Sequence, residues 1–174
     1  YWRAGEPARN AHTLDAVIET AAALGAPTVR IWAGAKSSDG AYESYRAQVV
    51  EDARRAARAA ADAGMTVSFE FQANTLNDTC DSALNLLEAV NHPSMKTYWQ
   101  PDYAVEFDDR IRALEMLARQ VTNIHVFHAP GGQRMALSRG RNDWRKYLHY
   151  LADRSGPHFV LIELVERDYP ENLV

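Results

Sequence analysis

The sequence predicts an α/β fold, specifically a (β/α)8 TIM barrel of which these 174 residues supply about five β/α units. Helical and strand patterns alternate strictly, which is typical of a parallel sheet because each crossover helix returns the chain to start the next strand in the same direction. A polar residue recurs near the C-terminal end of four strands, at Glu70, Gln100, His125 and Glu163. Barrels place their active sites at that end. In a doubly wound open sheet, the alternative, only the strands beside the switch point would contribute, so four contributing strands favour the barrel.

The individual elements follow from apolar periodicity and from their boundary residues. Thr13 is the expected cap of the first helix and Gly25 ends it, while Gly64 ends the second helix. The strands are short apolar runs between the helices. In order, we expect helix 13–24, strand 28–32, helix 42–63, strand 65–71, helix 78–90, strand 96–100, helix 108–120, strand 123–128, helix 143–153 and strand 159–165.

Two carboxylates lie inside runs that otherwise read as buried strands. Glu70 is in MTVSFEF (65–71) and Glu163 is in FVLIELV (159–165). Desolvating an unpaired carboxylate is costly, so a metal ion, a substrate or a cationic partner must compensate for it. An ion pair with Arg30 is the structural alternative. Strand alternation places Glu70 on the inner face of the barrel, opposite to the apolar residues that pack under the helices.

The histidines of the strand at 123–128 have opposite parity. His125 and His128 are three residues apart, so both cannot share the inner face unless the strand bulges or ends before His128. His125 is the candidate ligand, and a satisfied core histidine is its structural alternative. His128 is then a candidate for contact with a substrate.

Composition and charge exclude several other classes of protein. With 47% hydrophobic and 24% charged residues and a net charge of −4, the chain has the balance of a soluble globular protein without a basic surface, so we expect neither nucleic acid nor a membrane as partner. The single cysteine, Cys80, cannot form an internal disulfide, and no apolar run reaches the roughly 18 residues of a membrane span. We therefore expect a cytoplasmic protein. The chain opens on Tyr1 and closes within a helix-like turn at 169–174, so we expect 1–174 to be a fragment of a single barrel domain that lacks the first strand or strands and the C-terminal unit.

Five segments carry a family resemblance through their order and spacing. They are LGAPTVRIWAG (24–34), SFEF (68–71) followed by NTLND (74–78), WQP (99–101), HVFH (125–128) and LIE (161–163). Together they resemble the xylose isomerase-like TIM barrels, the sugar phosphate isomerase/epimerase superfamily. The resemblance implies one divalent metal ion, bound by Glu70, Gln100, His125 and Glu163. Two carboxylates, one amide and one imidazole suit Mn, Mg or Co better than a thiolate-preferring metal, and zinc is also compatible.

The chain departs from the family pattern around these ligands. Gln100 stands where an aspartate is usual, and Tyr103 stands where many members carry a histidine. The HVFH segment stands where His-x-Lys-Asp is usual. A neutral amide oxygen still ligates a hard cation but supplies less charge, which lowers the expected metal affinity. Asp102 is a substitute ligand if the register differs.

The resemblance also implies an activity, that of an isomerase or epimerase of carbohydrate metabolism. Its substrate is a sugar or a sugar phosphate, and the reaction proceeds by proton transfer through an enediolate. Glu70 and Glu163 are the expected acid/base pair, because two carboxylates that flank a substrate can remove a proton and return it. His128, Trp32 and Arg134 are candidate substrate contacts, although Trp32 also suits a packing role. Pairing of two chains into a homodimer is a further expectation from related barrels.

Two other functions stay open from the sequence. A metal-dependent sugar dehydratase of the inosose type uses the same frame. A non-catalytic sugar-binding barrel with a degenerate metal site is the alternative from another class, and the glutamine at position 100 is its main support. An endonuclease resembling the abasic-site nucleases is disfavoured, because it needs a basic face for the phosphate backbone.

Overall fold

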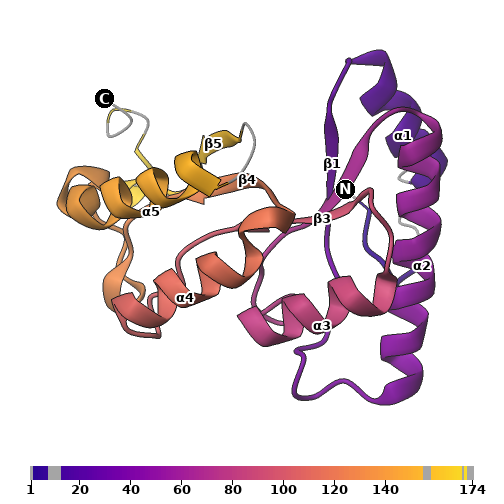
Figure 1. Ribbon diagram of the computed structural model, residues 1–174, viewed down its shortest axis with the longest axis horizontal. Coiled ribbons are helices and arrows are strands. Elements are labelled where there is room, and N and C mark those ends of the chain that lie inside the picture. Colours follow the sequence, from indigo (N-terminus) through magenta and orange to yellow (C-terminus); the bar gives the residue numbers. More distant parts are fainter. Residues whose placement is uncertain (1, 8–12, 155–157, 170, 172–174) are drawn as a thin grey trace. The chain divides into compact units, whose positions relative to one another are not determined.

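The computed structural model describes residues 2–7, 13–154, 158–169 and 171. Within these residues, helices and strands alternate as the sequence predicts (Figure 1). The main elements are α1 (Leu14–Ala23), β1 (Thr28–Ile31), α2 (Glu43–Asp62), β2 (Thr66–Phe69), α3 (Cys80–Val90), β3 (Met95–Trp99), α4 (Phe107–Leu117), β4 (Val121–Val126), α5 (Arg141–Arg154) and β5 (Phe159–Ile162). Four 3-10 turns complete them: η1 (Ala118–Gln120), η2 (Pro130–Gly132), η3 (Leu137–Gly140) and η4 (Glu166–Asp168). Packing divides the chain into two compact units, residues 1–98 and 99–174.

The first unit is a parallel sheet with helices packed against it. β1 pairs with β2 and β2 with β3, so neighbours in the sheet follow the order of the chain. The Thr13 side chain accepts a hydrogen bond from the Ala16 amide at 3.2 Å and caps α1, as predicted. Gly25, at φ +65°, then turns the chain into β1, because a left-handed conformation suits glycine. A core of fully buried strand and α2 side chains holds this unit together, including Ile31, Val49, Ala53, Val67 and Phe69.

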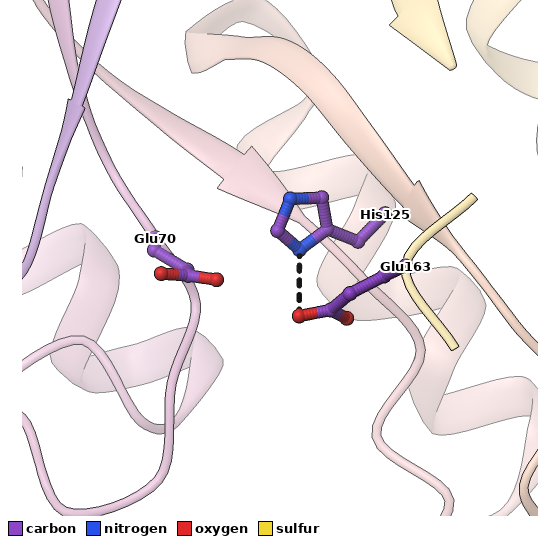
Figure 2. Close-up of side chains that lie close together, drawn as sticks. All are labelled: Glu70, His125 and Glu163. Atoms are coloured by element: carbon purple, nitrogen blue, oxygen red, sulfur yellow. Dashed lines mark ion pairs between the residues drawn. The ribbon is translucent and has the colours of Figure 1, made fainter. Parts of the chain in front are cut away.

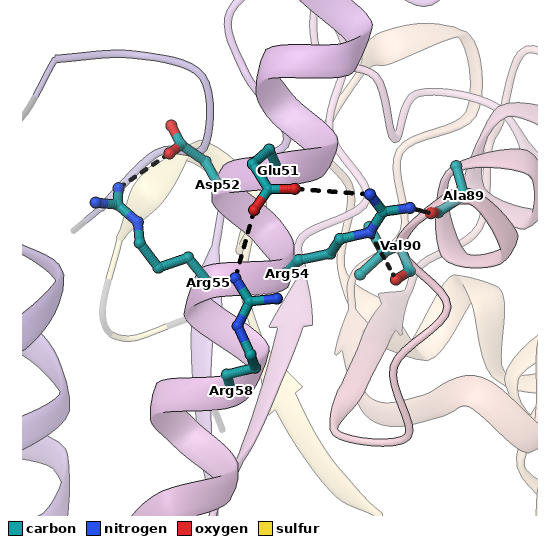
Figure 3. A network of polar contacts seen from close by, with 7 residues as sticks. All are labelled: Glu51, Asp52, Arg54, Arg55, Arg58, Ala89 and Val90. Atoms are coloured by element: carbon teal, nitrogen blue, oxygen red, sulfur yellow. Dashed lines mark hydrogen bonds and ion pairs between the residues drawn. The ribbon is translucent and has the colours of Figure 1, made fainter.

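The Arg54 side chain connects α2 to α3 in the first unit (Figure 3). The Arg54 guanidinium donates to the carbonyl oxygens of Val90 at 3.2 Å and Ala89 at 2.5 Å, and Glu51 lies 3.6 Å from it. These carbonyls are among the last four of α3, which have no partner inside the helix. Arg54 therefore caps the C-terminus of α3 from the neighbouring helix.

The second unit contains the parallel pair β4 and β5, in the register His125 to Leu161. Aromatic rings form much of its core: the ring centroids of Trp99 and Tyr147 lie 5.0 Å apart and those of Trp144 and Tyr147 lie 5.4 Å apart. Both pairs have the tilted edge geometry that aromatic quadrupoles favour. This packing anchors the strand ends that carry Gln100 and His125.

Two expectations about the strands can be compared with the structure, and a third expectation, about a helical turn, falls mostly on residues outside the described range. β4 ends at Val126, so His128 lies beyond the strand and the parity conflict between the two histidines does not arise. The residues of β5 are 39 to 60% exposed, and the buried strand expected at 159–165 is wrong, because among the described residues β5 pairs with β4 alone. The helical turn expected at 169–174 lies mostly outside the described residues. None of the described helices is long and apolar enough to cross a membrane.

Candidate metal centre

Glu70 is a buried carboxylate at the C-terminal end of β2. Its amide donates to the Ile31 carbonyl at 2.9 Å, which continues the β1–β2 pairing one residue past the strand. The residue is 2% exposed. Arg30 Nη1 donates to Oε1 at 3.0 Å, and the Trp32 indole N–H donates to Oε2. The ion pair with Arg30, expected as the structural alternative, is therefore present and compensates for the desolvation of this carboxylate.

The same contacts confirm the strand parity. The Thr28 and Ser68 hydroxyl oxygens lie 3.1 Å apart, two residues before Arg30 and Glu70 on the two strands. Thr28, Arg30 and Trp32 have one parity on the first strand, and Ser68 and Glu70 have one parity on the second. A carboxylate has about four lone-pair sites, so two donors do not by themselves exclude metal ligation by Glu70.

Three more predicted ligands converge within the second unit. His125, on β4, is 4% exposed, and its Nδ1 lies 3.2 Å from Gln100 Oε1 and 3.3 Å from Glu163 Oε1. Figure 2 shows the Glu163 carboxylate pointing at the His125 ring. Gln100 directly follows β3 and Glu163 directly follows β5. The ends of β3, β4 and β5 therefore bring one imidazole nitrogen and two oxygens together.

This donor set fits a divalent cation. Imidazole nitrogen, amide oxygen and carboxylate oxygen are ligands for Mg, Mn, Co and Zn, whereas a thiolate is missing from the set. Within residues 99–174, His125 offers an imidazole nitrogen, Glu163 a carboxylate oxygen and Gln100 an amide oxygen. Asp102, the substitute ligand expected if the register differs, lies in an exposed turn, where its carboxylate accepts the Ala104 amide at 2.8 Å.

The burial argument holds for one glutamate and not for the other. The Glu163 side chain is 27% exposed, in contrast to the nearly complete burial of Glu70. The expectation that Glu163 is desolvated inside a buried strand is therefore wrong, since the residue follows an exposed strand. The support for Glu163 is its contact with His125 instead.

The other predicted site residues have partners within their own units. Trp32 donates to Glu70, and the Arg3 guanidinium lies 4.2 Å from its ring centroid, so its indole does more than present an apolar wall. Arg134 forms an ion pair with Asp168 of the same chain. His128 follows β4, and its Nδ1 lies 3.3 Å from the Tyr103 hydroxyl.

Tyr103 was singled out in the sequence only as a departure from the family pattern, without a role. The structure places its ring edge-on to His128, with the centroids 5.6 Å apart. Burial raises the pKa of the Tyr103 hydroxyl. Burial also lowers the pKa of His128, and the negative charge of Asp143 opposes this second shift. The His128 imidazole is therefore predominantly neutral at pH 7.

Alternating strands and helices, with metal-type donors at the C-terminal ends of successive strands, define the chain as a (β/α) barrel protein. The family model for the xylose isomerase-like TIM barrel matches residues 4–173. The chain therefore belongs to the xylose isomerase-like TIM barrel family. A search of curated proteins finds no significant match.

Solved structures with different activities share this fold. The probable 3-DHS dehydratase AsbF of Bacillus anthracis, involved in petrobactin synthesis, is 20% identical with a TM-score of 0.75, over 97% of this chain and 69% of that chain. The family 2 AP endonuclease of Brucella melitensis is 20% identical with a TM-score of 0.72, and the match covers 91% of this chain and 62% of that chain. A D-allulose 3-epimerase from Methylomonas sp. is 18% identical with a TM-score of 0.65, and the match covers 92% of this chain and 59% of that chain. The chain thus spans 59 to 69% of their lengths, and at these identities the similarity shows the fold alone.

Proposed function

We propose that this protein is a metal-dependent isomerase or epimerase that acts on a sugar or a sugar phosphate through an enediolate. The observation that carries the proposal is the convergence of Gln100 Oε1 and Glu163 Oε1 on Nδ1 of His125, at the C-terminal ends of three successive strands. Membership of the xylose isomerase-like family, which has D-allulose 3-epimerase among its structural neighbours, supports the choice of reaction.

We propose Glu70, Gln100, His125 and Glu163 as the ligands of one divalent ion. Their hard oxygen donors favour Mn, Mg or Co, and zinc is compatible with the set. A divalent ion held there would bind the adjacent carbonyl and hydroxyl oxygens of a ketose and acidify the C–H bond between them. The neutral amide of Gln100 makes binding of the ion weaker than with an aspartate at this position.

In this proposal the two glutamates also transfer the proton. Glu70 is held at both carboxylate oxygens, by Arg30 and by Trp32, so its orientation is fixed before a substrate binds. Glu163 is more exposed, and in the described part of the chain its carboxylate contacts His125. Removal of a proton by one glutamate and its return by the other gives epimerisation at the same carbon or isomerisation at the neighbouring carbon.

Substrate contacts complete the proposal. We assign His128 and Trp32 to hydroxyl groups and the sugar face, and Arg134 to a phosphate or carboxylate. Arg134 is 41% exposed and already bonds the carboxylate of Asp168, which shows that its guanidinium can reach an anionic group. The protein in this view works on small molecules in the cytoplasm, without nucleic acid, and pairing into a homodimer is part of the same proposal.

Two alternatives are distinguished by chemistry. A dehydratase, the activity named for the Bacillus anthracis neighbour, would release water from its substrate and form a new double bond. A non-catalytic sugar-binding barrel would bind a ketose without exchanging any C–H proton. Proton exchange without net loss of water selects the isomerase or epimerase.

Metal content is the first test. The full-length protein is purified without chelator and analysed by mass spectrometry beside a Glu70→Gln/Glu163→Gln variant. We expect near-stoichiometric Mn, Mg, Co or Zn in the parent and its loss in the variant. The matched control is Glu88→Gln/Glu115→Gln, which removes one exposed carboxylate from each unit and retains the metal.

Solvent proton exchange is the second test. D-Fructose is incubated in D2O with the Mn-loaded parent, and deuterium incorporation at carbon is followed by NMR. Metal-dependent incorporation that is absent from the double variant supports the proposal. A parent that binds no metal, even after Mn is added, refutes it.

A further inference from the structure

One edge of the His128 ring, that of Nδ1, is enclosed by neighbouring groups. Its Nδ1 faces the Tyr103 hydroxyl at 3.3 Å, and the backbone of Gly140 closes the same edge. A Cβ atom built on Gly140 would lie 2.6 Å from Nδ1 and 3.0 Å from Cγ, so only glycine allows this approach without displacement. In the described part of the chain, the hydrogen bonds of this ring are confined to Nδ1. The half-buried ring therefore presents Nε2 as its remaining polar atom.

The position of the tyrosine proton follows from a second contact. The Tyr103 hydroxyl oxygen lies 3.0 Å from the Phe127 carbonyl oxygen. A carbonyl can only accept, and two oxygens at this distance attract each other only with a proton between them. The single hydroxyl proton of Tyr103 must therefore point to Phe127.

The Tyr103 hydroxyl then has no proton to donate to His128. An unprotonated Nδ1 at 3.3 Å would place its lone pair against a lone pair of the phenol oxygen. A protonated Nδ1 instead makes a hydrogen bond there. Burial lowers the pKa of His128, so the ring carries one proton near neutral pH, and that proton is on Nδ1.

Neighbouring groups fix the tyrosine in this position. The Arg110 guanidinium lies 4.9 Å from the centroid of the Tyr103 ring and 3.9 Å from the Asp143 carboxylate. The Phe127 carbonyl that receives the tyrosine proton is itself fixed by the Trp144 indole N–H, at 2.8 Å. Tyr103 is therefore held from its ring face and through its hydroxyl at the same time.

We propose that Tyr103 is a positioning residue that locks His128 as the Nδ1–H tautomer, so that Nε2 acts as an acceptor for a hydroxyl group of the bound sugar. This assignment rests on the proposed function for the identity of the ligand. The tautomer itself depends only on contacts within residues 99–174. A neutral Nε2 acceptor selects ligands with an O–H donor at this position and discriminates against an ether or a deoxy sugar, because the acceptor would then be left without a partner.

The tautomer is measured directly by long-range 1H–15N NMR of the histidine rings. Spectra are recorded above the ordinary histidine pKa of about 6.5, and His128→Asn identifies the signals. In the parent we expect His128 Nδ1 in the protonated range and Nε2 in the unprotonated range. In Tyr103→Phe the hydroxyl acceptor is missing, and we expect Nδ1 to shift toward the unprotonated range and Nε2 toward the protonated range.

A nearby hydroxyl provides the matched control. Tyr147→Phe also deletes a buried hydroxyl from this unit, but the Tyr147 hydroxyl has no hydrogen bond to His128, so the His128 signals should stay as in the parent. Gly140→Ala provides an independent perturbation, because its methyl group pushes against Nδ1. It should shift the same signals with Tyr103 intact. A parent with Nε2 protonated, or a Tyr103→Phe spectrum identical to the parent, overturns the inference.

A ligand titration tests the acceptor role separately. With D-fructose as the probe, the parent His128 Nε2 signal should shift on binding, and Tyr103→Phe should bind about 2- to 12-fold more weakly, the range for one ordinary hydrogen bond. Binding that leaves Nε2 unchanged overturns the acceptor role. Failure of the proposed function has a different signature, namely no metal in the parent and no exchange of the D-fructose C–H, while the ligand-free spectra still decide the role of Tyr103.

Discussion

Replacing Arg30 by methionine tests whether the ion pair with Glu70 stabilises the fold. The substitution keeps an unbranched side chain of similar length but removes the donor that lies 3.0 Å from Glu70 Oε1. The carboxylate is 2% exposed and keeps its bond from the Trp32 indole N–H. The change therefore removes a cation from beside a buried negative charge.

The expected loss of stability follows from the burial of the two partners. A hydrogen bond to a charged group contributes about 1.5–3 kcal/mol. The Arg30 side chain is 39% exposed, so water screens the pair, and we take the lower end, about 1.5 kcal/mol. For a chain of this length, that corresponds to a fall in Tm of about 3–6 °C.

The assay is urea unfolding followed by far-UV circular dichroism, with EDTA present so that a bound metal does not add to the stability. Arg30→Met is compared with Arg30→Met/Glu70→Gln, which also removes the buried charge but keeps an acceptor for Trp32. We expect the double variant to be more stable than Arg30→Met. The control is Arg58→Met, which removes a mostly exposed ion pair with Glu51 and should change stability by less than about 0.5 kcal/mol.

Two results would refute this reasoning. One is an Arg30→Met protein within about 0.5 kcal/mol of the parent, the range of an ordinary surface substitution. The other is a double variant that is less stable than Arg30→Met, because the uncompensated charge would then not be the source of the loss.

The remaining predictions concern packing and protonation. Gly140→Ala should destabilise by about 1–3 kcal/mol in the same urea assay because its methyl group overlaps His128, whereas Gly40→Ala, whose Cβ meets only Ser37 Oγ at 3.3 Å, should lie near the parent. Burial raises the pKa of the Cys80 thiol to about 11, so iodoacetamide at pH 7 should label Cys80 far more slowly in the folded protein than in urea, and equal rates would contradict this. Burial lowers the pKa of His128 below that of the unfolded chain, so the unfolded state binds its proton more readily and stability falls as the pH drops below about 6.5. His128→Asn should lose less stability than the parent over the same pH interval, as measured by thermal unfolding.

The order of elements was predictable because it depends on local periodicity. Helical spacing, the Thr13 cap and Gly25 define the first helix and its end without reference to the rest of the chain, and the structure reproduces them. The exposure of β5 was not predictable in this way. An apolar run such as FVLI reads as buried in a parallel sheet, but its actual exposure depends on which strands and helices cover it.

In the candidate site, too, features that depend on local position were predictable from the sequence, whereas contacts between distant residues were not. Position near the C-terminal end of a strand singled out Gln100, His125 and Glu163, because parallel strands place these ends together. The contact of Glu70 with Trp32 and that of His128 with Tyr103 could not be read from position, since Trp32 is 38 residues from Glu70 and Tyr103 is 25 residues from His128. Gly140 offered a usable signal. A glycine just before a helix start indicates a close approach, although the sequence does not name what approaches.

The cap that Arg54 places on α3 has a consequence for how the first unit opens. Helix ends usually fray first, because water readily replaces the partners of their backbone groups. Here the Ala89 and Val90 carbonyls accept hydrogen bonds from the Arg54 side chain of α2 (Figure 3). The last turn of α3 therefore opens only when these hydrogen bonds to Arg54 break. The last turn of α3 should therefore keep its amide protection in hydrogen exchange longer than an uncapped helix end does.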